Sequence, residues 1–110
     1  MKFIAKLAVL TVFVSGMAFA KSPFVKTSME SIVLHDVEDV VIIKLSSEIT
    51  NNEKCTKNDE LVLKKDTHNM FQETYSALLA SFHSGTKIAG VVSGCHQWGQ
   101  PILVRLDIVK

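Results

Sequence analysis

The chain has 110 residues, 47% of them hydrophobic, and its 12 basic and 11 acidic side chains give a net charge of +1. This length suits one small domain. The charge balance argues against nucleic-acid binding, which needs a concentrated positive face, because the densest basic cluster is only Lys64-Lys65. The sequence has no internal repeat, low-complexity tract or linker rich in proline and glycine.

The first twenty residues have the pattern of a secretory signal peptide. Lys2 and Lys6 accompany an apolar run that extends to Val14, and the small-x-small sequence Ala18-Phe19-Ala20 follows. The run is too short for a convincing membrane span. We expect cleavage after Ala20, which leaves residues 21–110 as one domain with 10 basic and 11 acidic side chains. The expected location is secreted or periplasmic, in a Gram-negative-type bacterium.

The expected compartment determines how the two cysteines are interpreted. Cys55 and Cys95 stand 40 positions apart, and thiols in an oxidising compartment usually form disulfides. We therefore expect an intramolecular Cys55–Cys95 bond rather than a metal or redox pair; two free thiols or a bond to another chain are the alternatives. Closing a loop of this length stabilises a fold by about 4 kcal/mol in the chain-entropy model.

Three strands are expected in the N-terminal half. The β-branched runs at residues 29–34 and 40–45 flank a polar turn and form a natural hairpin. The second run is apolar on both faces, which indicates a central or strongly curved strand. A polar loop at residues 46–59 leads to a third short strand at residues 60–63.

A change of period after residue 66 predicts one helix at residues 68–84. Its expected core-facing stripe consists of Phe71, Tyr75, Leu78, Leu79 and Phe82. Asp66 or Thr67 is expected to cap the start, and Ser84-Gly85 to end the helix. Met70 and Phe82 could instead contact a neighbouring subunit.

Two strands follow the helix, at residues 87–93 and 102–109. In the last strand, one face is expected to carry Ile102, Val104, Leu106 and Ile108. Three strands, a helix and two strands are the order of a mainly β, five-stranded OB-fold-like barrel with the helix at one end. An α+β two-layer sandwich satisfies the same order and is the alternative.

The C-terminal half carries a recurring pattern: a helix at 70–80 (MFQETYSALLA), a break at 84–87 (SGTK), a strand ending in Gly94-Cys95 and a closing strand at 101–104 (PILV). Over residues 68–108 it resembles small secreted bacterial proteins related to the subtilase cytotoxin B subunit. The resemblance implies an OB-fold and, by analogy with the toxin, a five-membered ring that binds cell-surface glycans ending in sialic acid. No sugar-contacting residue is transferred, because those lie in the N-terminal half, where the chain does not match.

The loop between the last two strands is the candidate ligand site. His96, Gln97 and Trp98 combine an aromatic ring with imidazole and amide groups, next to the expected disulfide. Sugar sites often pair an apolar ring face with a few polar groups. The alternative is that Trp98 covers the mouth of the barrel and its neighbours are solvated.

The sequence argues against an enzyme, a metal site or a cofactor. It contains no Gly-x-Ser-x-Gly elbow, and its cysteines are expected to be oxidised. No two of its four histidines have the His-x-x-x-His spacing; they are His35, His68, His83 and His96. His35 with the acids of residues 36–39 could form a loose surface site, but solvated loop residues are the simpler interpretation. We therefore expect a non-enzymatic binding module that recognises a glycan, or alternatively a periplasmic protein-interaction or inhibitor module that binds an envelope protein.

Overall fold

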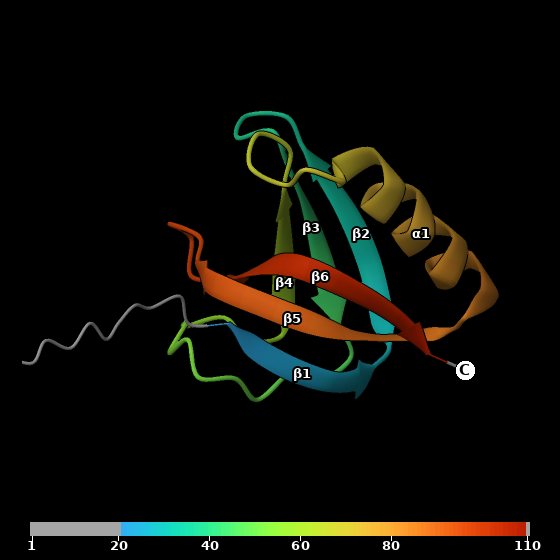
Figure 1. Cartoon of the computed structure of the whole chain (residues 1–110), viewed down its shortest axis with the longest axis horizontal. Helices are drawn as coiled ribbons and strands as arrows, with labels where there is room; N and C mark the ends of the chain where they lie inside the picture. The colour runs from blue at the N-terminus through green and yellow to red at the C-terminus, as the bar shows by residue number, and fades with distance from the viewer. Residues whose placement is uncertain (1–20, 110) are drawn as a thin grey trace, which may run out of the picture.

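The computed structural model describes residues 21–109, so the predicted signal peptide lies outside the described residues. Six strands and one helix follow one another in the order β1 (Ser22–Thr27), β2 (Met29–His35), β3 (Val40–Leu45), β4 (Glu60–Lys64), α1 (Phe71–Ser84), β5 (Lys87–Cys95) and β6 (Pro101–Val109). The strands pair in the order β1-β5-β6-β4-β3-β2 to form one mixed sheet. This sheet curls into a half-barrel with α1 beside it (Figure 1).

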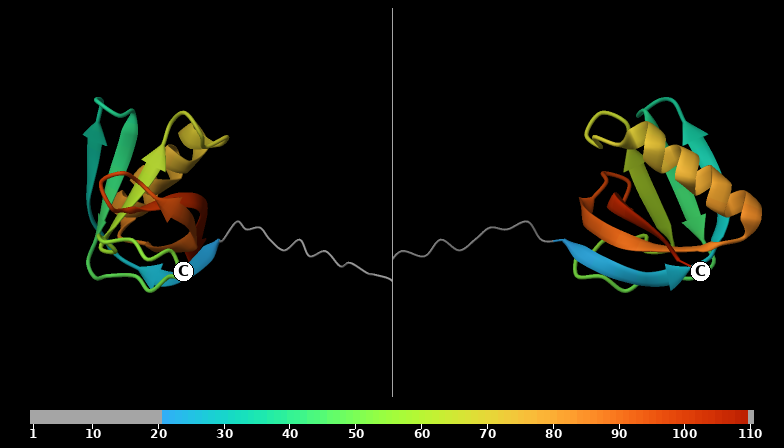
Figure 2. Two further views of the ribbon diagram at one scale, coloured as in Figure 1. Left: turned by 90° about the vertical axis from the view of Figure 1, so that its left-hand side faces the viewer. Right: turned by 45° about the vertical axis from the view of Figure 1, so that its right-hand side comes forward.

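The curl follows from how the chain joins the two outer strands. β1 and β2 lie at opposite edges of the sheet, yet only Ser28 separates them in sequence. Because consecutive Cα atoms are about 3.8 Å apart, the two edges must meet at this corner. The Ser46 N–H donates to the Ser28 carbonyl at 2.9 Å and fixes the corner to the end of β3. The two views in Figure 2 show the strands turning around the resulting interior.

The strand β1 was not among the five predicted strands, so the sheet has one strand more than expected. Its six residues include Pro23, which lacks an N–H and is tolerated at sheet edges, where β1 lies. Ser22 and Phe24 are buried, and an irregularity of pairing between Phe24 and Thr27 turns Thr27 inward as well. β1 thus contributes Phe24 to the core through pairing with β5, at the other end of the sequence.

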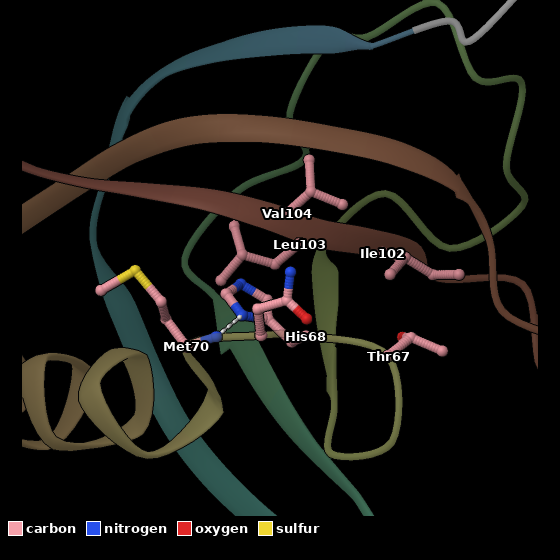
Figure 3. Close-up of a pocket in the computed structure, with 7 residues that line it drawn as sticks. Thr67, His68, Met70, Ile102, Leu103 and Val104 are labelled. Carbon is pink, nitrogen blue, oxygen red and sulfur yellow. Dashed lines mark hydrogen bonds between the residues drawn. The ribbon is translucent and has the colours of Figure 1, made fainter.

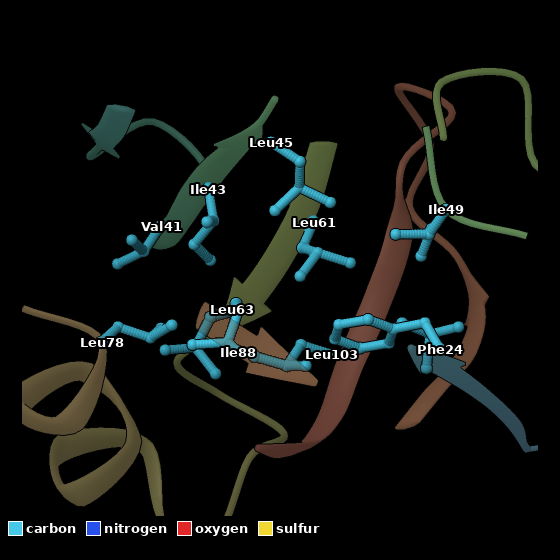
Figure 4. Packing of buried hydrophobic residues seen from close by; sticks show 11 residues of the cluster. Phe24, Val41, Ile43, Leu45, Ile49, Leu61, Leu63, Leu78, Ile88 and Leu103 are labelled. Atoms are coloured by element: carbon cyan, nitrogen blue, oxygen red, sulfur yellow. The ribbon is translucent and has the colours of Figure 1, made fainter. Parts of the chain in front are cut away.

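The core is formed by aliphatic side chains on the inner face of the curled sheet (Figure 4). Its fully buried members are Ile43, Leu61, Leu63, Leu78, Ile88, Val92 and Leu103. Burial of each such side chain contributes roughly 1.5–3 kcal/mol. The prediction that residues 40–45 form a central strand is confirmed, because β3 lies between β2 and β4. The adjacent β3 residues Val40 and Val41 point to opposite faces of the sheet, and both are buried.

The helix ends where predicted but begins later. Gly85 has φ +74°, and its N–H bonds the Phe82 carbonyl, so the glycine closes α1 as expected. The predicted caps Asp66 and Thr67 are wrong, because the first helical residue is Phe71 and Met70 is the N-cap. The Met70 N–H donates instead to His68 Nδ1 at 3.2 Å, so a turn held by histidine precedes the helix.

The helix packs through a narrower face than predicted. Thr74, Leu78 and Ser81 are buried, whereas Leu79 and Phe82 are each 41% exposed. Successive helical residues are turned by about 100°, so a face centred on Leu78 points Leu79 away from the sheet. In the part of the chain that the structure describes, no helix is long and apolar enough to cross a membrane.

The prediction that Ile102, Val104, Leu106 and Ile108 share one face of the last strand is also wrong. Leu103 is fully buried, while Val104 is 37% and Ile108 is 50% exposed. The pairing explains this: Val91 lies opposite Arg105 and Val92 opposite Leu103, so Val104 is an extra residue in β6. Such a bulge reverses the faces of the strand on its two sides.

Candidate functional site

The loop that connects β5 and β6 is a tight turn stabilised by its first residue. The His96 N–H donates to the Gln100 carbonyl at 2.7 Å, and the Gly99 N–H donates to the His96 carbonyl at 2.8 Å. The His96 side chain also takes part, because its Nδ1 accepts the Trp98 N–H at 3.2 Å. Three hydrogen bonds involving His96 or its imidazole thus define where Trp98 lies.

The base of this loop is fastened to residues 55–57. The predicted Cys55–Cys95 disulfide is confirmed, with the two Cα atoms 5.6 Å apart. The Gly99 carbonyl accepts the N–H groups of Thr56 and Lys57 at 3.1 and 3.0 Å. Gly99 has φ +103°, and a Cβ on it would collide with Thr56 Oγ1, so glycine is required here.

A carboxylate adds a second fastening close to the disulfide. One oxygen of Glu53 accepts the Gly94 N–H at 2.6 Å, and the other accepts the Ser22 hydroxyl at 2.6 Å. The Ser22 oxygen in turn accepts the Asn52 N–H at 3.0 Å. Glu53 therefore joins the start of β1 to the end of β5, and the base of the candidate loop is held on two sides.

The Trp98 ring contacts two imidazoles. The ring centroids of Trp98 and His96 are 4.7 Å apart in an edge arrangement, and those of Trp98 and His35 are 4.8 Å apart with tilted planes. His96 is only 6% exposed, Trp98 is half-buried and Gln97 is exposed. Of the three predicted ligand residues, Gln97 and part of Trp98 therefore face solvent, and His96 lies beneath them.

The environment of His96 favours its neutral form. Burial lowers the pKa of His96 below the ordinary 6.5, and the positive charge of Lys64 lowers it further, while the negative charge of Glu38 opposes this. Because Nδ1 accepts the Trp98 N–H, the proton of the neutral ring resides on Nε2.

The sequence considered His35 only for a loose metal site with residues 36–39, and did not place it beside Trp98. His35 ends β2 and lies 61 positions before His96, yet the fold brings both rings against Trp98. Its Nδ1 is buried and has no hydrogen-bond partner among residues 21–109. The available signal was its position at the end of a strand beside a hairpin turn, where side chains of different loops can meet.

The arrangement provides hydrogen-bonding groups and ring surface. Within residues 21–109, no three side chains among His, Cys, Asp and Glu come together as a metal site would require. The cluster of His35, His96 and Trp98, with the neighbouring Gln97, brings an indole ring, an amide and two imidazoles together.

A second candidate surface is the groove between α1 and β6. Figure 3 shows one end of it, between the turn before α1 and β6. The groove consists of two adjoining cavities of about 340 and 410 Å³, which share His68, Met70 and Val104. Met70, Val104 and Ile108 are exposed along it. Burial lowers the pKa of His68, whose Nε2 is buried and unpaired in the described chain.

Comparison with known proteins assigns no function to these surfaces. No protein-family model, no curated protein and no solved structure matches the chain.

Proposed function

We propose that the half-barrel is an OB-fold. Five of its strands and the helix have the predicted order, with α1 between the third and fourth of them. β4 and β6 pair in parallel, at Val62 and Ile102, and every other pair is antiparallel. The last hairpin therefore folds back so that β6, not β5, lies beside β4, as a Greek-key barrel requires. The added strand β1 pairs with β5 and brings the sheet closer to closure.

We propose further that the protein is an extracytoplasmic, non-enzymatic binding module that recognises a glycan at the Trp98 loop. The observation that carries this proposal is the cluster of His35, His96 and Trp98 beside the exposed Gln97, on a loop anchored by the disulfide. A pyranose presents an apolar face to an indole and hydroxyl groups to an amide and imidazoles. A rigid base lowers the cost of ordering the loop when a ligand binds.

A glycan array probed with the oxidised protein, residues 21–110, tests this proposal. We expect binding to a defined glycan class, with loss of the signal in Trp98→Ala and a weaker signal in Gln97→Ala. Leu79→Ala is the matched control, because Leu79 is exposed on α1, outside the loop, and its removal should leave binding unchanged. The absence of wild-type binding, or equal binding by Trp98→Ala, would overturn the proposal.

The resemblance to toxin B subunits supports assembly into a ring of five copies. β1 and β2 are the edge strands of the sheet, and each has one edge that pairs with no other strand in residues 21–109. Val33 and Leu34 on β2 are exposed beside one such edge. Light scattering during size-exclusion chromatography should give a mass near five protomers, and a monomer at all concentrations would contradict the ring and multivalent glycan binding.

A protein-interaction or inhibitor module is the second candidate, and the groove between α1 and β6 favours it. Beyond Leu103, no strand in the described chain pairs with the edge of β6 that faces α1. An extended segment of an envelope protein could add to this edge and cover Met70, Val104 and Ile108. An identified partner whose binding is lost in Ile108→Asp, and retained in Val25→Asp on β1, would support this function. Retained binding in Ile108→Asp would exclude the groove.

A further inference from the structure

The position of Trp98 depends on a hydrogen bond that only neutral imidazole can accept. The Trp98 N–H donates to His96 Nδ1 at 3.2 Å, and the two rings lie 4.7 Å apart. When an imidazole is protonated, both of its nitrogens carry hydrogens and neither accepts. A second proton on His96 would therefore point Nδ1–H at the Trp98 N–H and leave both groups without an acceptor.

The rest of the loop does not share this dependence. Gly99 is held to Thr56 and Lys57 by backbone hydrogen bonds, and Cys95 by the disulfide, none of which titrates in mild acid. The structural change on protonation is thus confined to the tip of the loop, where Gln97 and Trp98 lie. The ring centroid of the second imidazole, His35, lies 4.8 Å from that of Trp98, and its Nδ1 has no hydrogen-bond partner within residues 21–109.

We propose that His96 is a proton-operated latch, and that acidification releases Trp98 from its position against the two imidazoles. The charged groups that act on His96 from the packed elements are Lys64 at the end of β4 and Glu38 in the turn between β2 and β3. His35, at the end of β2, is the other titratable group in contact with the Trp98 ring.

The electrostatic environment sets where the latch opens. Burial and Lys64 lower the pKa of His96 below 6.5, so the latch is closed at neutral pH and opens in mild acid. As far as it concerns ligand binding, this inference rests on the proposed glycan function. One proton changes the affinity by at most about tenfold per pH unit below the transition.

Trp98 is the one tryptophan of the chain, so its fluorescence reports on the loop without any ligand. Emission wavelength and quenching by acrylamide are measured in the oxidised protein between about pH 8 and pH 5, where histidine is the side chain that titrates. We expect a shift to longer wavelength and stronger quenching in acid, with a midpoint below 6.5, the ordinary histidine pKa. Emission wavelength and quenching that do not change with pH in the wild-type protein would overturn the proposal.

Two variants identify the titrating group. In His96→Asn, a side-chain oxygen can take the place of Nδ1 without titrating, and the transition should disappear. In His35→Asn, the matched control, it should persist. A transition retained in His96→Asn, or lost in His35→Asn, would overturn the assignment. Should His96→Asn not fold, the backbone amide resonance of Trp98 in the wild-type protein must shift with the fluorescence midpoint, and its constancy would also overturn the proposal.

The fluorescence experiment and the glycan array together separate the latch from the glycan function. A transition without glycan binding at any pH supports the latch and refutes the proposed function. Glycan binding with a loop that does not respond to pH refutes the latch alone.

Discussion

Removal of the disulfide is the perturbation whose magnitude follows most directly from the structure. The bond closes a loop between residues 40 positions apart. In the chain-entropy model, this restricts the unfolded chain by about 4 kcal/mol. A small domain has a total stability of roughly 5–15 kcal/mol, so the loss is a large share of it. Replacing both Cys55 and Cys95 by alanine removes few core contacts, because Cys95 is exposed and Cys55, although buried, is not part of the main core cluster.

Urea unfolding followed by far-ultraviolet circular dichroism measures the effect. We expect the double variant to lose about 4 kcal/mol of unfolding free energy, which lowers Tm by roughly 15–30 °C for a domain of this size. The denaturant slope should increase, because an unfolded chain without the cross-link exposes more surface. A reducing agent should weaken the wild-type protein to the same level and leave the double variant unchanged.

The result that would refute this reasoning is a loss of less than about 2 kcal/mol, the lower limit for native disulfides in small secreted domains. The hydrogen bonds of Glu53 and Gly99 would then hold the loops without covalent help. An unchanged denaturant slope with a large loss of stability would place the effect in the folded state instead.

Three further outcomes are expected. Leu61→Ala, in the centre of the core, should lower the unfolding free energy by roughly 2–5 kcal/mol in urea titrations, whereas Leu34→Ala, at a side chain 65% exposed, should change it little. Gly99→Ala should cost about 1–3 kcal/mol and alter the near-ultraviolet circular dichroism of the loop, because the residue has φ +103°. Acidification should destabilise the fold. Burial lowers the pKa values of His68 and His96, so the stability that their neutral rings contribute is complete above pH 6.5 and is lost as the pH falls below that value. A His68→Asn/His96→Asn variant with the same loss of urea midpoint in acid would contradict this assignment.

Features encoded by neighbouring residues could be predicted from the sequence. The two-sided apolar run of residues 40–45 identified a central strand, because only a strand covered on both faces tolerates it. The end of α1 was visible in Gly85, since the left-handed conformation there favours glycine. The disulfide followed from an even cysteine count together with the expected compartment.

Features set by distant partners could not be predicted in this way. The bulge at Val104 depends on how β6 pairs with β5, and it makes Leu103 rather than its neighbours the core residue. β1 is stabilised by pairing with β5, and the local sequence around Pro23 does not predict a strand there. His35 joins Trp98 only through the curl of the sheet, so its place in the candidate site required the fold.

From the pairing of β1 with β5 we also expect an order of events during folding. Ser22 lies opposite Val92, so the first strand has its ladder partner near the other end of the chain. Contacts between residues so far apart form late, because closing long loops costs entropy before any contact forms. In a chain that emerges N-terminus first, the β2-β3-β4 meander can form while β1 is still unpaired, because β5 follows later in the sequence. Closure of the half-barrel is therefore a final step that requires nearly the whole chain.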